Sequence, residues 1–168
     1  GGWVYEVDGS RDFNGDGFND VLACAGDDGM DSGPKRAYCF DGVSGDVLWE
    51  RPTGGPVFSV IAVDDFTGDG VPDAVAGTSD EWEIQGRAVG INGETGAEEW
   101  SFDVEGSSVW GLCQVGDANA DGINDVMVGD FYGNYYLVSV TNGAELASGG
   151  GLGIMTGLVR INDVNGDG

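Results

Sequence analysis

A nine-residue pattern of aspartate, asparagine and glycine returns along the chain and constrains the fold more than any other feature. It occurs complete three times, as DFNGDGFND (12–20), DFTGDGVPD (65–73) and DANADGIND (117–125). A shortened copy, DVNGDG, occupies residues 163–168. The copies begin at residues 12, 65, 117 and 163, which are 53, 52 and 46 residues apart. Internal repeats of this length are typical of solenoids, propellers and tandem arrays.

Each complete copy has the donor spacing of a metal-binding loop. Oxygen-bearing side chains stand at positions 1, 3, 5 and 9, which in the first copy are Asp12, Asn14, Asp16 and Asp20. Position 6 is glycine, and Phe18 at position 7 can offer its backbone carbonyl. Calcium loops surround the ion with six to eight oxygens in this way. Three carboxylates placed so closely repel one another unless a cation lies between them.

Two other interpretations of the pattern explain less. An EF-hand requires a glutamate at position 12, where this chain has Ala23, Ala76 and Val128. Ordinary solvated turns of Asp, Asn and Gly do not explain why carboxylates return at positions 1, 5 and 9 in all three copies.

Four short strands are predicted in each repeat. An apolar strand leads into the loop, at residues 3–7, 57–63, 109–115 and 154–161. A second strand follows the loop at once, at 21–26, 74–79 and 126–130. A third strand, a tight turn and a fourth strand complete the unit, with the third at 36–42, 87–93 and 134–140 and the fourth at 47–52, 98–104 and 144–148.

This order predicts an all-β protein made of β-propeller blades with four antiparallel strands each. No helical periodicity of 3.6 residues competes with it. We expect a single propeller segment over 1–168, with repeats at about 1–53, 54–105 and 106–150 and a partial one at 151–168. That is about three blades and the first strand of a fourth, so the chain is expected to be a piece of a longer protein or an incomplete propeller. Blades of this kind must stack to bury their faces.

Several side chains carry more specific expectations. The first strands are almost continuously apolar, so each is expected to be buried on both faces. Trp49 and Trp100 hold the same place in the fourth strands and are expected to pack between blades, whereas the third blade has Leu146 nearby and should pack more loosely. A disulfide joins Cys24 to Cys39 if the strand register sets them opposite each other. Cys113 is expected to be a buried free thiol.

Composition excludes several classes of function. The formal net charge is −24 with only six Lys and Arg, which excludes nucleic acid as a partner and disfavours anionic membrane surfaces. The absence of histidine removes the commonest general base and every Ser-His or Cys-His pair. No apolar run approaches the roughly 18 residues of a membrane span.

The repeats resemble the FG-GAP (VCBS) family, which forms the β-propeller head of integrin α-subunits and occurs in many secreted microbial proteins. The resemblance rests on the D-x-N-G-D-G-x-x-D pattern followed by an apolar strand, and it covers nearly the whole chain. It implies one calcium ion per loop, held by Asp12, Asn14, Asp16, Phe18 and Asp20; by Asp65, Thr67, Asp69, Val71 and Asp73; and by Asp117, Asn119, Asp121, Ile123 and Asp125. Phe18, Val71 and Ile123 would act through their carbonyls. Thr67 departs from the pattern, and the fourth copy has Asp163, Asn165 and Asp167 but no ninth position.

A second, weaker resemblance concerns the turns. YCFDGVSGDVLWE and VGINGETGAEEWSF are similar to the strand-turn-strand units of quinoprotein-type propellers. The enzymes of that group hold a quinone on the propeller axis. This chain has no adjacent cysteine pair and no evident catalytic acid outside the loops, so the similarity indicates blade architecture.

The leading functional hypothesis is a non-enzymatic, extracellular or cell-surface propeller segment that binds calcium and serves adhesion or ligand binding. The calcium would bridge the first two strands of each blade, and the dissociation constants of such loops suit extracellular calcium. A protein or glycan ligand would meet the variable linkers 26–35 and 79–86, which include Trp82, or residues 131–134. The alternatives are part of a quinoprotein-like or other secreted enzyme whose catalytic residues lie elsewhere, and a module that self-associates through exposed blade edges.

Overall fold

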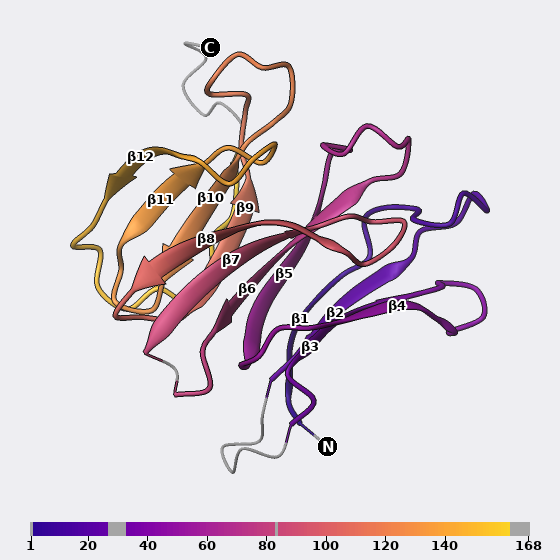
Figure 1. Cartoon of the computed structure of the whole chain (residues 1–168), viewed down its shortest axis with the longest axis horizontal. Coiled ribbons are helices and arrows are strands. Elements are labelled where there is room, and N and C mark those ends of the chain that lie inside the picture. The colour runs from indigo at the N-terminus through magenta and orange to yellow at the C-terminus, as the bar shows by residue number, and fades with distance from the viewer. Residues whose placement is uncertain (1, 27–32, 83, 162–168) are drawn as a thin grey trace.

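The chain folds into three antiparallel sheets of four strands, which confirms the predicted all-β propeller-like architecture (Figure 1). The computed structural model describes residues 2–26, 33–82 and 84–161, and no helix occurs in them. The first sheet contains β1 (Val4–Asp8), β2 (Val21–Ala25), β3 (Arg36–Phe40) and β4 (Val47–Pro52). The second contains β5 (Val57–Val63), β6 (Asp73–Ser79), β7 (Gln85–Ile91) and β8 (Glu98–Glu105). The third contains β9 (Val109–Gln114), β10 (Val126–Asp130), β11 (Tyr135–Val138) and β12 (Glu145–Gly149).

We call these sheets blades 1, 2 and 3, and their first strands lie side by side in the middle of the fan (Figure 1). Side chains of β1 join it to β5. Glu6 accepts a hydrogen bond from the backbone N–H of Val60 at 3.0 Å, and Asp8 accepts one from Ala62 at 2.8 Å. These carboxylates thus satisfy backbone donors of a strand that β1 does not pair with in a sheet.

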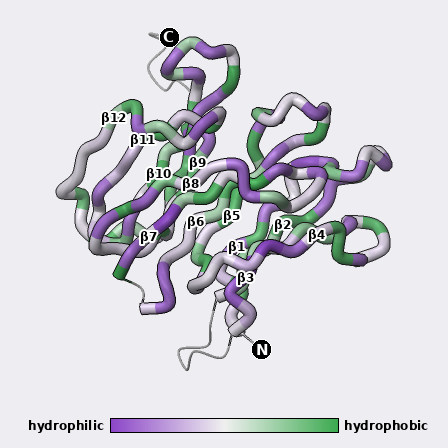
Figure 2. Tube along the Cα trace, in the orientation of Figure 1, coloured by the Kyte–Doolittle hydropathy of each residue, from purple (hydrophilic) through white to green (hydrophobic). Residues whose placement is uncertain are grey.

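Apolar side chains fill the two spaces between the blades. The core between blades 1 and 2 includes Leu22 and Cys39 on one side and Val60 and Ile91 on the other. The core between blades 2 and 3 is built in the same way, with Val75 facing Val128. Figure 2 shows the hydrophobic residues that run through β2, β5 and β6. Among the described residues, only blade 2 has both faces covered by other blades.

The two tryptophans pack between blades as predicted. Trp49 is buried, and its indole N–H donates to the carbonyl of Gly93 in blade 2 at 2.7 Å. Trp100 repeats the contact one blade further on, with a bond of 2.6 Å to Val140. Each ring also lies against a turn glycine of the next blade, where a Cβ on Gly96 would come within 3.0 Å of Trp49.

Blade 3 lacks this tryptophan, but Leu146 is not its replacement. Trp49 pairs with Cys39 and Trp100 with Gly90, and the corresponding pair in blade 3 is Ala147 with Leu137. A small side chain therefore stands where the other blades place an indole. The looser packing expected there follows from Ala147.

Residues 154–161 do not form the strand that the sequence predicts. They are without regular structure and run along blade 3, where the N–H of Met155 donates to the carbonyl of Phe131 at 3.3 Å. The side chain of Met155 is buried, and Leu158 lies against Gly111. A β-strand needs a partner for its ladder, and among the described residues none flanks this segment.

One further expectation was wrong, and the condition set for a disulfide is not met. β1 is not buried on both faces, because the side chains of Val4 and Val7 are both 61% exposed. No disulfide joins Cys24 and Cys39, since Cys24 pairs with Ala37 and Cys39 with Leu22. This diagonal arrangement separates the two Cα atoms by about 7–8 Å, beyond the usual disulfide span.

The three cysteines are free thiols. Burial raises the pKa of Cys24 to about 11 and that of Cys39 to about 12. Cys113 is half-buried, more exposed than the sequence predicts. The described residues contain no helix that could span a membrane.

Candidate metal centres

The three aspartate loops share one backbone conformation. Positions 4 and 6 take left-handed backbone angles in every loop, with φ of 76° at Gly15 and 91° at Gly17 in the first. Glycine adopts this region without strain. In the third loop Ala120 takes the place of the first glycine and still has φ of 62°. The turn is thus a property of the whole pattern.

Loop carboxylates accept hydrogen bonds from amides of their own loop. The aspartate at position 1 accepts the N–H of position 6, at 2.9 Å for Asp12, 2.8 Å for Asp65 and 2.9 Å for Asp117. The aspartate at position 5 accepts the N–H of position 7 in each loop, the residue whose carbonyl is the predicted ligand: Phe18, Val71 and Ile123. These bonds fix the loops around their acidic side chains.

The aspartate at position 9 is a buried anchor. Asp20, Asp73 and Asp125 are each fully buried. The Oδ2 atom of Asp73 accepts the N–H of Phe66 at 2.8 Å, and its Oδ1 atom accepts the N–H of Gly93 at 2.8 Å. The carboxylates at position 9 of the other loops bind equivalent amides. Each loop is therefore tied to the turn between the third and fourth strands of its blade.

The side chains of the second loop converge most closely. The hydroxyl of Thr67 lies 3.3 Å from Oδ1 of Asp65 and 3.4 Å from Oδ1 of Asp73. Asn92, which begins the following turn, donates its amide to Asp69 at 2.7 Å and approaches Thr67 at 3.3 Å. The Thr67 hydroxyl at position 3 and the Asn92 amide are both neutral, and together they link the acids at positions 1, 5 and 9 of this loop.

The turn residue facing the loop differs between blades. In blade 3 the hydroxyl of Thr141 donates to Asp121 at 2.9 Å, so this loop also receives a neutral donor. In blade 1 the residue equivalent to Asn92 is Asp41, a carboxylate that accepts the N–H groups of Val43 and Ser44. Asp41 is a carboxylate, so it cannot donate a hydrogen bond as Asn92 does.

Hydrogen bonds and burial shift the acidities in opposite directions. The N–H of Gly17 lowers the pKa of Asp12 below its usual range, and the N–H of Val71 lowers the pKa of Asp69. The N–H of Ile123 does the same to the pKa of Asp121. Burial raises the pKa of Asp73, although the N–H of Gly93 opposes it. Asp12, Asp69 and Asp121 therefore stay charged to a lower pH than an ordinary aspartate.

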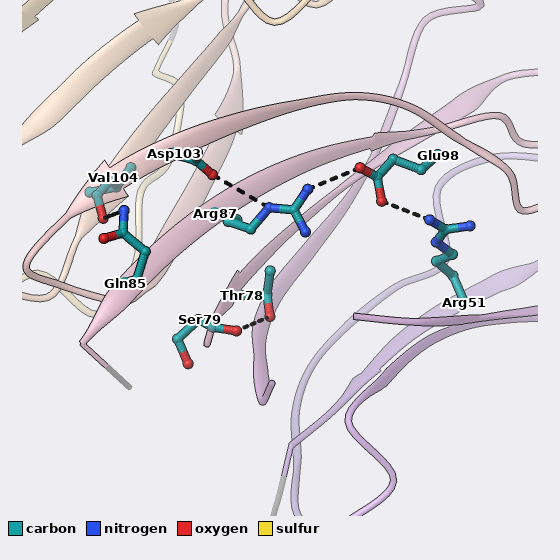
Figure 3. A network of polar contacts seen from close by, with 8 residues as sticks. All are labelled: Arg51, Thr78, Ser79, Gln85, Arg87, Glu98, Asp103 and Val104. Atoms are coloured by element: carbon teal, nitrogen blue, oxygen red, sulfur yellow. Dashed lines mark hydrogen bonds and ion pairs between the residues drawn. The ribbon is translucent and has the colours of Figure 1, made fainter. Parts of the chain in front are cut away.

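The arginines of the blades pair with acids outside the loops. Arg11 binds Asp64 at 2.9 Å, and Arg36 binds Glu50 at 2.7 Å. Glu98 receives Arg51 from blade 1 at 2.7 Å and Arg87 from its own blade at 2.9 Å (Figure 3). These ion pairs hold strands and blades together and leave the loop carboxylates to other partners.

The predicted ligands match calcium in chemistry, but they are not gathered into a carboxylate cage. Within the described residues, no group of three or more His, Cys, Asp and Glu side chains lies close enough together to hold a metal ion. Amide, hydroxyl and carbonyl oxygens must supply part of any coordination sphere. The loop backbones already have a turned conformation in all three copies. The fourth-copy residues Asp163, Asn165 and Asp167 lie outside the described part of the chain.

Sequence reasoning missed the residues of the adjacent turn. Asn92 and Thr141 contact the loops across the blade, and Asp41 holds the place of Asn92 in blade 1. All three are distant from the loops along the chain. Their common signal is an acceptor or donor side chain within the tight turn that follows each third strand.

The predicted partner surface is only partly described: Trp82 is 76% exposed and Tyr132 65% exposed, whereas Asp27, Asp28, Asp31 and Glu83 lie outside the described residues.

Comparison with known proteins supports the fold alone. No family model matches the chain, and no curated protein matches its sequence. The computationally designed Ika4 protein aligns with a TM-score of 0.66 and 18% identity over 96% of this chain and 81% of its own. BBS1N, solved in complex with ARL6DN, aligns with a TM-score of 0.58 and 9% identity over 85% of this chain and 44% of its own. BamB from Moraxella catarrhalis gives a TM-score of 0.50 and 14% identity over 77% of this chain and 33% of its own. The chain is therefore β-propeller-like and spans less than half the length of the last two proteins.

Proposed function

We propose that this chain is a calcium-binding β-propeller segment of the FG-GAP (VCBS) type, which acts outside the cell in adhesion or ligand binding. The observation that carries the proposal is the threefold repetition of one loop. Each loop has the same turn, three aspartates and a buried anchor at position 9. The arginines that could neutralise these acids pair with other carboxylates.

Calcium would have a structural role in this proposal. When bound, the ion would neutralise the acids of a loop and draw in the oxygens of positions 1, 3, 5 and 7. The buried aspartate already fastens the loop to the neighbouring turn, so a rigid loop would fix β1 to β2, β5 to β6 and β9 to β10. A ligand that prefers the folded state adds its binding free energy to stability. Dissociation constants of about 10⁻⁴–10⁻³ M suit extracellular calcium.

A thermal melt tests this proposal directly. The purified chain is melted in chelator, then with calcium titrated back, with magnesium as the control cation. We expect a rise in Tm that is specific for calcium and saturates near about a millimolar. An identical melt in chelator and in saturating calcium would overturn the proposal.

A quinoprotein-like enzyme is the weaker alternative. The described tight turns support blade architecture, and the chain lacks histidine and an adjacent cysteine pair. An ultraviolet–visible spectrum of the purified protein separates the two, because a bound quinone absorbs where the protein alone does not.

A further inference from the structure

A hollow of about 280 Å³ lies between blades 1 and 2, and no role has yet been given to it. Its walls come from four separate segments: the β1–β2 loop, β4, the β5–β6 loop and the β7–β8 turn (Figure 1). The side chains that matter for its chemistry are those of Phe13, Leu48, Val71 and Glu94. We call this hollow the inter-blade pocket. Because both blades contribute to it, its shape depends on their packing.

The inter-blade pocket combines an apolar wall with one acid. Phe13 is 4% exposed and belongs to the core between the blades, against which Val71 also packs. Leu48 is 37% exposed, so it presents part of its apolar surface to solvent. Glu94 is exposed and makes no hydrogen bond or ion pair with any described residue. A ligand here would meet hydrocarbon along its length and a single uncompensated negative charge at one point.

The charge around the pocket favours a cation. The chain carries a net charge of −24, and none of its six Lys and Arg residues lines the pocket. Asp12, which is half-buried, and Asp16, which is exposed, lie in the same loop as Phe13. A concentration of one sign of charge at a cleft attracts ligands of the opposite sign and speeds their association.

We propose that the inter-blade pocket receives the side chain of a lysine or arginine from a basic partner protein. The aliphatic stem of either residue would cover Phe13, Leu48 and Val71, and its cationic head would reach the carboxylate of Glu94. Long basic side chains bury their stems against apolar surface in this way while the charged end stays near water. The inference goes beyond calcium binding. Calcium in the first loop would neutralise Asp12 and Asp16, but Glu94 lies outside the loops and would keep its charge.

Titration of the full chain with small probes tests the proposal by nuclear magnetic resonance. The probes are the Nα-acetyl methylamides of arginine and lysine, and the neutral control is the citrulline compound, which has nearly the same shape as the arginine one. We expect saturable shifts at the methyl groups of Leu48 and Val71, with a dissociation constant on the order of millimolar. The titrations are run in calcium and in chelator, so that a failure of the loops to bind calcium is seen separately.

Two variants sharpen the test. Glu94→Gln removes the charge and should weaken arginine binding by about three- to tenfold, without changing the weak citrulline response. Glu99→Gln is the matched control, because Glu99 is exposed on the same blade and does not line the pocket. Equal weakening by both variants would mean a diffuse electrostatic effect and would overturn the proposal. So would citrulline binding as tightly as arginine, or shifts that avoid Leu48 and Val71.

Discussion

The first residue of the turn after the third strand decides whether the acids of loops 1 and 2 receive a neutral hydrogen-bond donor. Asn92 supplies an amide proton to Asp69, whereas Asp41 at the same place in blade 1 supplies none. We expect the first loop to depend more on calcium than the second. Asn92→Asp should therefore lower the Tm in chelator and enlarge the rise in Tm on adding calcium, because like charges close together destabilise the loop.

The reverse substitution provides the matched control. Asp41→Asn introduces an amide donor at the turn position that Asn92 holds in blade 2, and it should reduce the calcium-dependent rise in Tm. If both variants shift Tm equally in chelator and in calcium, the turn residues act on the fold alone. The prediction that the first loop depends more on calcium than the second would then be wrong.

Glu6 gives the protein a specific pH dependence. Burial raises its pKa above the ordinary value of 4.5, although the hydrogen bond from Val60 opposes the shift. The folded state therefore holds the proton more tightly than the unfolded chain. This contribution to stability is complete below the ordinary pKa and is lost as the pH rises through the folded pKa.

Replacing Glu6 should remove that loss. Glu6→Gln keeps an oxygen acceptor for Val60 and does not titrate, so its free energy of unfolding should gain on the wild type between about pH 4 and pH 7. Urea denaturation at several pH values measures the difference, with Glu99→Gln as the exposed control. A constant difference across this range would contradict the assigned burial effect.

At this scale the sequence predicted which residues belong to each loop but not what each one does. Positions 1, 5 and 9 all read as equivalent ligands. Burial distinguishes Asp20, Asp73 and Asp125 from the rest, and it arises from strands and turns far along the chain. The hydrogen bond from Asn92 to Asp69 could not be predicted for the same reason, because the spacing of residues along the chain does not show which of them meet across a blade.

At the scale of elements, the tryptophans are the clearest inter-blade contacts. Trp49→Ala removes a buried ring and leaves the carbonyl of Gly93 without its donor. We expect a loss of about 3–5 kcal/mol in the free energy of unfolding. Trp82→Ala is the control, because its side chain is 76% exposed and should change stability by less than about 0.5 kcal/mol. Similar losses for the two variants in urea denaturation would contradict this assignment.

Strand positions were predicted well where neighbours supply a ladder. β4, β5 and β10 have the predicted bounds, because apolar runs and tight turns are local signals. The segment 154–161 has the same apolar character but no strand beside it in the described chain. The sequence also left the strand register open. A Cys24–Cys39 disulfide required the two residues to lie opposite each other, and the observed register misses this by two residues. Pairing depends on the turns and bulges that set the alignment of strands.

At the scale of the whole molecule, the fan of blades leaves one apolar face uncovered among the described residues. Strand pairing sets Val7 opposite Ala23, and a bulge in β4 sets Val47 opposite Phe40, so both valines lie on the side away from Cys39 and the core. The side chains of Val7 and Val47 are 61% and 52% exposed. On the same face the rings of Tyr38 and Phe40 stack on each other, with their centroids 5.5 Å apart. On the other side of the fan, blade 3 is partly covered by Met155. Exposed apolar patches of this kind mark interaction surfaces.

We therefore expect the isolated chain to associate with copies of itself through the open face of blade 1. Light scattering should give a mass above 17.3 kDa that grows with concentration. Val47→Asp should shift the distribution towards the monomer, because a charge on the buried side of an interface is costly. Val43→Asp is the control, since Val43 is 64% exposed but lies in the turn before β4. A compact monomer at every concentration would show that the open face needs no cover, and an equal effect of both variants would place the contact elsewhere.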